Sequence, residues 1–400
     1  MITFDQLHDI IKVETEILLI HIMSIPFIDL KTQYNHNKSD IDDAIHRVLD
    51  HGQYIMGPEV KELEEKLADY IGVNFALTCS SGTDALLLPL MANGIENGDI
   101  VFTTPFTFFA SAESITLAGG TPVFVDIDPN TYNLCPQDLE EKIKAAISSG
   151  KNRLRAIMPV DLFGLAADYQ QINDIAEKYD LIVIEDAAQA FGAPYSNKKA
   201  CGLGDVAATS FYPAKPLGCY GDGGAVFTND QELYEKMLSI RVHGQGVSGD
   251  KYDNIRIGLN ARMDTIQAAI LIEKLKNYDN EIELRNKVAS TYTNNLDSAV
   301  KTPTVPENQG CVWAQYSIQV DDRQKLQSDL KEKGIPTATF YPTPIHLSTA
   351  YNHLGYKKGD FPVSEAIAER IVSLPMHPYL DEKQILNITN AVNESVRNTD

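Results

Sequence analysis

The chain has 400 residues, of which 44% are hydrophobic and 22% are charged, and its formal net charge at pH 7 is −21. A chain of this length can bury a sizeable core and exceeds one small domain, so we expect a large α/β domain with a smaller companion. The acidic balance disfavours binding to nucleic-acid backbones and to anionic membrane surfaces, although a few local cations can still bind an anionic small molecule.

The cysteines and the N-terminal segment exclude further classes. The five Cys residues are odd in number and form no CxxC, which favours neither a disulfide framework nor a zinc site and fits a cytoplasmic protein. No stretch reaches the roughly 20 apolar residues of a membrane span, and the short apolar run at 17–22 follows an acidic segment, unlike a secretory signal. Because Met23 is a second plausible start, we expect residues 1–22 to be a dispensable extension; an ordinary N-terminal helix is the alternative.

The first predicted elements are two amphipathic helices, at 41–49 and 60–71, separated by a turn with Gly52, Gly57 and Pro58. From Phe75 onward, apolar strands alternate with helices. The predicted strands cover 75–78, 101–104, 122–126, 156–160, 181–185, 207–211 and 225–228, and the predicted helices cover 80–91, 110–117 and 169–179. Continuous apolar strands that alternate with helices are typical of a mainly parallel sheet with helices on both faces.

The C-terminal part has a different character. A long helix is predicted to start near Asp264, and a strand at 315–320 and a helix at 324–333 follow in a Pro-containing region. These features predict a small α+β domain over 276–400 after a large domain over 23–275, with a soft boundary because the long helix could span both.

Two charged residues that follow strands are the first candidates for chemistry. Lys215 lies in a Pro- and Gly-rich turn, where a lysine of lowered pKa can form a Schiff base with an aldehyde cofactor; a surface lysine in a loop is the simpler alternative. Asp186 follows an apolar strand at the edge where open α/β sheets bind ligands. Its carboxylate could pair with a protonated pyridine nitrogen or cap a helix.

Two further segments follow strands in the same way. The small residues at 80–84 open a helix whose free N–H groups could bind a phosphate, although plain N-capping explains them as well and no GxxxxGK[ST] pattern is present. An aromatic of segment 105–109 could stack on a flat ring, with core packing as the alternative. Phosphate site, aromatic, Asp and Lys, in this order, fit an enzyme of the aspartate aminotransferase fold (type I) that uses pyridoxal 5'-phosphate (PLP).

Several motifs in register resemble the DegT family of sugar aminotransferases over nearly the whole chain. They are His51-Gly52-Gln53-Tyr54 to Gly57-Pro58-Glu59-Val60, Ser81-Gly82-Thr83-Asp84-Ala85-Leu86, Glu185-Asp186-Ala187-Ala188-Gln189, Lys215-Pro216-Leu217-Gly218 to Gly224, Asn260-Ala261-Arg262-Met263-Asp264 and Ser373-Leu374-Pro375-Met376-His377.

The resemblance implies a role for each matching residue. Lys215 would hold PLP and move protons, and Asp186 would pair with the pyridine nitrogen. The other implied cofactor contacts are Gln189 beside the ring hydroxyl, Phe108 stacked on the ring, Gly82, Thr83 and Ser210 at the phosphate, and Asn260, which would reach the phosphate in the other subunit of a homodimer. Arg262, His243 and Tyr341 are candidate substrate contacts, and a loop-ordering role for His243 is equally compatible with the sequence.

The resemblance also implies the reaction. Dehydratase relatives carry His where this chain has Lys215, so amino transfer is expected, and the turn Gly221–Gly224 resembles members that act at C3. We therefore expect transfer of an amino group from glutamate to the C3 keto group of UDP-2-acetamido-2-deoxy-3-oxo-glucuronate, in the synthesis of a surface polysaccharide such as lipopolysaccharide O-antigen. Phe340 stands where enzymes of that type tend to have His, which keeps a dTDP-3-keto-6-deoxyhexose or a 4-keto sugar nucleotide as alternatives.

The sequence disfavours three other classes of protein. Sugar dehydration is disfavoured by Lys215. A non-catalytic PLP-binding regulator would need a DNA-binding appendage, yet the chain is acidic and has no obvious helix-turn-helix. A nicotinamide enzyme is disfavoured because no GxGxxG follows the first strand, and His346 and His353 do not form a metal pattern. A cytoplasmic homodimer without metal, nucleic-acid or membrane partners is therefore expected.

Overall fold

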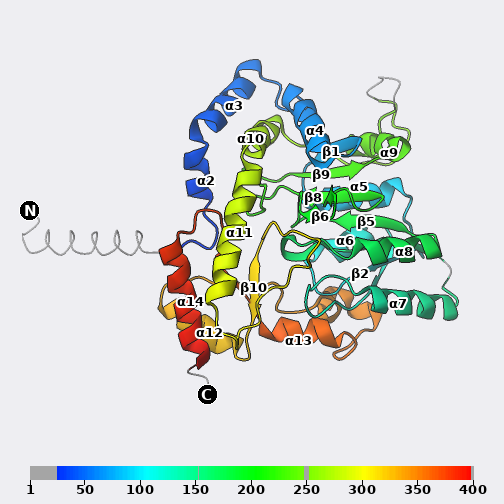
Figure 1. Ribbon diagram of the computed structural model, residues 1–400. Coiled ribbons are helices and arrows are strands. Elements are labelled where there is room, and N and C mark those ends of the chain that lie inside the picture. Colours follow the sequence, from blue (N-terminus) through cyan, green and yellow to red (C-terminus); the bar gives the residue numbers. More distant parts are fainter. Residues whose placement is uncertain (1–24, 152, 247–251, 398–400) are drawn as a thin grey trace, which may run out of the picture.

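The computed structural model describes residues 25–151, 153–246 and 252–397. A seven-stranded sheet lies at its centre, in the order β1-β9-β8-β5-β4-β2-β3 (Figure 1). Its strands are β1 (Phe75–Cys79), β2 (Ile100–Thr103), β3 (Thr121–Phe124), β4 (Leu154–Met158), β5 (Ile182–Asp186), β8 (Val206–Ser210) and β9 (Gly224–Thr228). The predicted mainly parallel α/β fold is confirmed.

One strand departs from the parallel pattern. β9 pairs antiparallel with both β1 and β8, whereas the other four neighbouring pairs are parallel. Consecutive antiparallel strands need only a loop between them, whereas parallel strands need a crossover helix. The loop 211–223, which contains Lys215, is therefore the direct connection from β8 to β9.

Helices cover both faces of the sheet because successive strand residues point to opposite sides. On one face, Val206, Ala208 and Val226 pack with α5 (Gly82–Ala92), α6 (Ala110–Leu117) and α9 (Gln231–Arg241). On the other face, Ala207 and Phe227 pack with α4 (Pro58–Ile71) and α10 (Thr265–Leu275). The same face continues under α7 (Pro136–Ser148) and α8 (Tyr169–Tyr179), and α3 (Lys38–His51) packs on α10.

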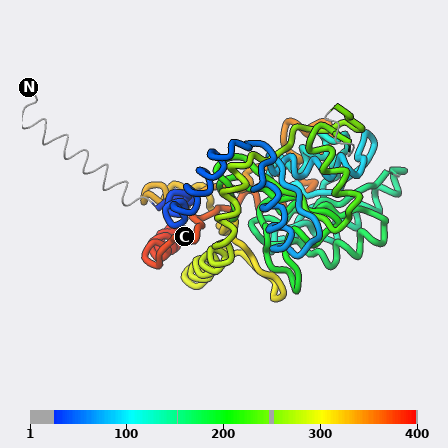
Figure 2. Tube along the Cα trace, turned by 90° about the horizontal axis from the view of Figure 1, so that it is seen from above, coloured from blue at the N-terminus to red at the C-terminus, as the bar shows by residue number. Residues whose placement is uncertain are grey.

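The C-terminal residues build a second hydrophobic core around a two-stranded antiparallel sheet. Its elements are α11 (Tyr278–Asn295), β10 (Tyr316–Gln319), α12 (Arg323–Glu332), β11 (Ile371–Leu374) and α14 (Glu382–Arg397), whereas α13 (Pro362–Arg370) packs in a separate cluster with Phe106 and Val160. Ile25 belongs to this core, and the Met376 N–H donates to the Phe27 carbonyl at 3.1 Å. Figure 2 shows accordingly that the first described residues lie beside the C-terminal helix.

The helix predicted to start near Asp264 does not span both parts of the chain, because α10 ends at Leu275 and α11 begins at Tyr278. The division at residue 275 stays a prediction, and the predicted extension 1–22 lies outside the described residues. No helix in the described ranges is long and apolar enough to cross a membrane. Short elements complete the description: α2 (Leu30–His36), β6 (Pro194–Tyr195), β7 (Lys198–Lys199) and 3-10 turns at Leu162–Gly164, Ile345–Leu347 and Thr349–Leu354.

Candidate active site

Asp186 is the last residue of β5 and lies at the carboxyl edge of the sheet, with 2% of its surface exposed. Its carboxylate accepts a hydrogen bond from the Ser111 hydroxyl at 2.6 Å and one from the Ala188 N–H at 3.2 Å. Burial raises the pKa of Asp186, while these donors and the charge of Lys215 oppose the rise. A buried carboxylate in this setting suits a cationic partner such as a protonated ring nitrogen.

Lys215 faces the same edge from the loop between β8 and β9. The loop is turned by a hydrogen bond from the Lys215 N–H to the Tyr212 carbonyl at 2.8 Å. Burial lowers the pKa of the Lys215 amine to about 8, and the negative charge of Asp186 opposes that shift. A lysine whose pKa lies this low has a reactive neutral fraction near neutral pH, as Schiff-base chemistry requires.

The first turn of α5 and the end of β8 form a common corner beside this pair. A Cβ at Gly82 would lie only 2.7 Å from the Cβ of Ser210, so the two segments are in contact. The Ser81 hydroxyl caps the helix by accepting from the Asp84 N–H at 3.1 Å, and Thr83 lies in the same turn. Helix N–H groups together with two hydroxyls are a suitable site for a phosphate.

The segment 260–264 passes next to this corner, because the Ser80 N–H donates to the Ala261 carbonyl at 3.0 Å. Asn260 is exposed, in the surface position that a contact with another subunit would need. Arg262 is half-buried, and its Nε has no hydrogen-bond partner among the described residues. An unpaired guanidinium nitrogen can bind an anion, as predicted for this residue.

Gln189 and Tyr341 join the sheet edge to the C-terminal part of the chain. The Gln189 side-chain Oε1 accepts from the Phe163 N–H at 2.8 Å, and its Nε2 donates to the Tyr341 hydroxyl at 3.1 Å. Phe108 is 61% exposed. Core packing is therefore the wrong interpretation of Phe108, and most of its side chain remains free for a ring to contact.

His243 is exposed and adopts a positive φ of 62°. Its backbone orders the loop, because its N–H donates to the Leu259 carbonyl at 2.8 Å and its carbonyl accepts from the Asn254 amide at 2.9 Å. His346 is buried and hydrogen-bonded to Glu365 at 3.1 Å. No potential metal cluster of three or more His, Cys, Asp or Glu occurs in the parts of the chain that the structure covers.

Ser111 and a buried acid pair next to Asp186 were not predicted from the sequence. Ser111 lies one turn beyond Phe108, a signal that the predicted helix 110–117 already contained. Asp161 donates its N–H to the Asp186 carbonyl at 2.9 Å, and its carboxyl meets that of Glu185 in the interior. Only the fold brings these two acids together, since 24 positions separate them along the chain.

The chain is similar to known proteins over most of its length. The DegT/DnrJ/EryC1/StrS aminotransferase family matches residues 35–393. A UDP-2-acetamido-2-deoxy-3-oxo-D-glucuronate aminotransferase of Pseudomonas aeruginosa is 50% identical over 92% of this chain and 99% of its own. A pleiotropic regulatory protein of Geobacillus stearothermophilus is 44% identical over 94% and 99%. The crystal structure of a DegT DnrJ EryC1 StrS aminotransferase from Brucella abortus superposes with a TM-score of 0.90 at 48% identity, covering 93% of this chain and 99% of that one.

Proposed function

The chain belongs to the DegT/DnrJ/EryC1/StrS aminotransferase family, whose enzymes depend on PLP, and we propose that it transfers an amino group from glutamate to the C3 keto group of a nucleotide-linked sugar. The observation that carries this proposal is the pair formed by Lys215, with a pKa lowered to about 8, and the buried Asp186 at one edge of the sheet. A lysine nucleophile and a carboxylate that favours a cationic ring are what amino transfer on PLP requires.

The described residues fit the cofactor. Lys215 and Asp186 would hold its aldehyde carbon and its ring nitrogen. Around them, the helix corner at Gly82, Thr83 and Ser210 would hold the phosphate, Phe108 would cover one ring face, and Gln189 would lie at the ring hydroxyl. When bound, PLP supplies a carbon that captures the amine and a ring that takes up the electron pair of the broken C–H bond. Lys215 Nζ would take the α-proton of glutamate and pass it to the cofactor, and Asp186 would hold the ring nitrogen protonated.

For the acceptor we propose UDP-2-acetamido-2-deoxy-3-oxo-glucuronate, in the synthesis of a surface polysaccharide such as O-antigen. The Pseudomonas relative named for this reaction supports it, as does the unpaired Arg262 Nε, which suits a diphosphate or a sugar carboxylate. Tyr341 and His243 are the other candidate contacts. Phe340 offers no hydrogen bond, so a dTDP-3-keto-6-deoxyhexose is the alternative acceptor.

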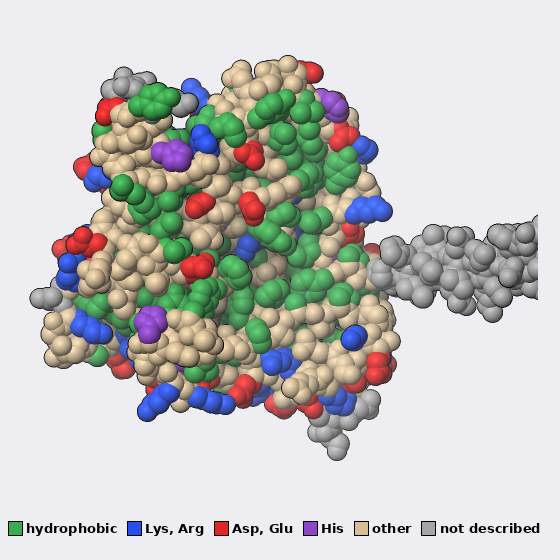
Figure 3. Space-filling view, turned by 180° about the vertical axis from the view of Figure 1, so that it is seen from behind, with side chains coloured by type: hydrophobic (Ala, Val, Ile, Leu, Met, Phe, Trp, Pro, Cys, Tyr) green, Lys and Arg blue, Asp and Glu red, His purple; other side chains and the backbone are tan. Residues whose placement is uncertain are grey.

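We propose further that the enzyme is a cytoplasmic homodimer with shared sites. The support is an exposed apolar segment beside the start of α10: Tyr54, Ile55 and Met56 are each more than 40% exposed. Ile55 bridges to Asp264, and the Tyr54 carbonyl accepts from the Thr265 N–H at 2.9 Å. Figure 3 shows more hydrophobic side chains gathered down the middle of the face opposite to that of Figure 1. Exposed apolar surface of this kind marks protein–protein contacts.

The test is the absorption spectrum of the purified chain with PLP, before and after glutamate is added. We expect a visible band that glutamate removes, and Lys215→Ala is expected to give neither the band nor any transfer. Lys198→Ala, at an exposed lysine, is the matched control and should behave as the parent chain does. A visible band that persists with glutamate would point to another donor or reaction, and substantial turnover by Lys215→Ala would refute the assignment.

A regulatory function is the second candidate, and the name of the Geobacillus relative favours it. A regulator would bind duplex DNA at low salt, which this acidic chain is not expected to do. The product assay with a 3-keto UDP-sugar and glutamate distinguishes the two, because a non-catalytic protein forms no amino sugar.

A further inference from the structure

Two side chains of α10 contact the loop that carries Lys215. The Gln267 side-chain Oε1 accepts from the Tyr220 N–H at 2.8 Å, and the Lys274 ammonium donates to the Gly218 backbone carbonyl. Seven residues separate Gln267 from Lys274, which is two helical turns, so both lie on the same face of α10. This face of the helix therefore binds the loop at two points, once as acceptor and once as donor.

The loop itself is tight, so these contacts fix more than their own residues. The Cys219 N–H donates to the Phe211 carbonyl at 2.7 Å. A Cβ at Gly218 would lie 2.6 Å from the carbonyl oxygens of both Tyr212 and Pro213, so the chain folds back on itself there. Because Gly218 is three residues from Lys215 in a loop without slack, a displacement of its carbonyl must also displace Lys215.

Burying the charged Lys274 ammonium costs desolvation free energy, which indicates that Lys274 has a role beyond packing. Lys274 is 4% exposed, and burial lowers its pKa to about 8, while the charge of Glu281 opposes the shift. Glu281 is itself buried and accepts from the Tyr379 hydroxyl at 2.6 Å and from the Gln33 amide at 2.9 Å. An apolar side chain would fill such a site without the desolvation penalty.

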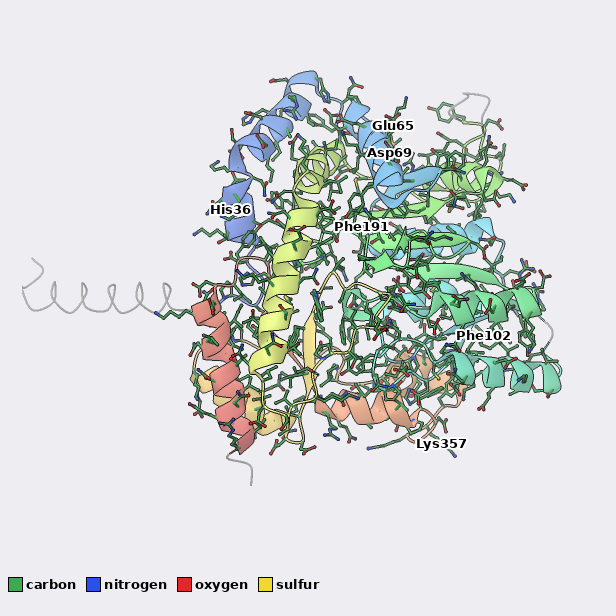
Figure 4. All side chains as sticks on the ribbon, in the orientation of Figure 1. His36, Glu65, Asp69, Phe102, Phe191 and Lys357 are labelled. Carbon is green, nitrogen blue, oxygen red and sulfur yellow. The ribbon has the colours of Figure 1, made fainter. Side chains whose placement is uncertain are left out.

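α10 is firmly placed on the sheet. Ala268 and Leu271 of this helix share a core cluster with Phe191 and Tyr278, and the Tyr278 hydroxyl donates to the Phe191 carbonyl at 2.8 Å. Figure 4 shows Phe191 between the sheet and the two helices α10 and α11. The segment that carries Asn260 and Arg262 leads directly into α10. The helix therefore connects the lysine loop with the predicted phosphate corner through one rigid element.

We propose that Lys274 and Gln267 are positioning residues that hold the 211–223 loop so that the Lys215 amine faces Asp186. This inference rests on the proposed function for its consequence, since the amine matters only if it reacts. The contacts themselves can be tested without any turnover.

The test compares Lys274→Met with the control Lys276→Met in the full-length chain. Lys276 lies two residues further on, is 60% exposed and pairs with Glu273. In Lys274→Met we expect faster amide exchange across 211–223. We also expect a kcat for the glutamate half-reaction lowered about 10- to 100-fold with a KM changed less than about twofold, because a misplaced group loses orientation and not affinity. Lys276→Met should match the parent chain in both.

The reactivity of Lys215 distinguishes a positioning role of Lys274 from a purely structural one. Acetic anhydride labels neutral amines, so the pH dependence of Lys215 labelling, read by mass spectrometry in the full chain before PLP is added, reports its pKa. A loosened loop exposes the amine to water, and the midpoint should rise from about 8 by about one pH unit in Lys274→Met. A variant that only loses stability would keep the parental midpoint.

Gln267 provides the second pair of variants. If Lys274→Met does not fold, this pair tests whether the contacts from α10 position the 211–223 loop. Gln267→Leu removes the acceptor for the Tyr220 N–H, whereas Gln267→Glu keeps one, so only Gln267→Leu should show the faster exchange and the raised midpoint. Parental exchange and labelling in Lys274→Met and Gln267→Leu would overturn the positioning role. A parent chain that shows no PLP band would instead overturn the proposed function and leave these two measurements valid.

Discussion

Ser111 is the residue that orients the proposed partner of the ring nitrogen. Its hydroxyl donates to Asp186 at 2.6 Å and in turn meets the Thr107 hydroxyl at 2.8 Å. Removing a hydrogen bond to a buried charge costs about 1.5–3 kcal/mol. We therefore expect Ser111→Ala to lower kcat for the glutamate half-reaction about tenfold, and Asp186→Asn to lower it more. Ser114→Ala, on the same helix, is the control, and an undiminished rate in Ser111→Ala would show that Asp186 needs no such support.

The buried pair Asp161 and Glu185 gives a prediction about pH and stability. The Glu185 carboxylate accepts backbone N–H groups of Cys201 and Leu203, whereas no N–H or O–H group of the described residues donates to Asp161 Oδ2. Burial and the adjacent charge of Glu185 raise the pKa of Asp161 well above its ordinary range. The Asp161 carboxyl therefore stays protonated and donates a hydrogen bond to the Glu185 carboxylate. The folded chain then binds a proton that the unfolded chain loses above about pH 4, and this contribution to stability declines as the pH rises.

A side-chain amide can replace the protonated Asp161 carboxyl, because both have a hydrogen-bond donor, but it cannot replace the Glu185 carboxylate, which only accepts. Asp161→Asn keeps a donor toward Glu185 and should flatten the decline of the unfolding free energy between about pH 4 and neutrality. Glu185→Gln would point an NH2 group at backbone donors and should destabilise the fold by about 1–3 kcal/mol. Chemical denaturation of both variants across this pH range checks the asymmetry. Equal destabilisation by the two amides would contradict the assigned proton.

At the level of elements, the close contact of α5 with β8 predicts the effect of one methyl group. In Gly82→Ala the new Cβ would lie 2.7 Å from the Ser210 Cβ, so the helix must move away from the strand end. Such overpacking costs about 1–3 kcal/mol and should weaken PLP binding at the phosphate corner, measured by titration of the visible band. Gly82→Ala combined with Ser210→Gly relieves the clash and should recover thermal stability. Its PLP affinity should stay low, since the Ser210 hydroxyl is gone; recovery of both would argue against a phosphate contact.

Most elements around the site were predictable because their sequence periodicity is strong. The helices at 110–117 and 169–179 have the predicted bounds, and β5 begins one residue later than predicted and ends one residue later, at Asp186. The direction of β9 was not predictable, because local apolar runs do not record which neighbour a strand pairs with. The helices α7, α9 and α14 were not anticipated, although their apolar residues face the cores as those of α8 do.

At the scale of the whole molecule, the sequence predicted which residues are functional candidates but not which of them contact one another. Lys215 and Asp186 stood out because each follows a strand, and parallel strand ends share one edge. The bond from Gln189 to Tyr341 spans 152 positions, and that from Lys274 to Gly218 spans 56. Contacts of this range depend on how the two parts of the chain pack, which no local pattern records.

The proposed homodimer predicts that subunits can complement one another. If Asn260 serves the phosphate of the other subunit, a hybrid of Lys215→Ala and Asn260→Asp chains contains one site with both native residues. Refolding the two inactive variants as an equal mixture makes half of the dimers hybrid, so about a quarter of the parental activity per chain should return. A mixture of Lys215→Ala with Asp186→Asn is the matched control, because both of these residues act within one subunit and no intact site can form. If the first mixture stays as inactive as the second, Asn260 does not act across an interface and the sites are not shared.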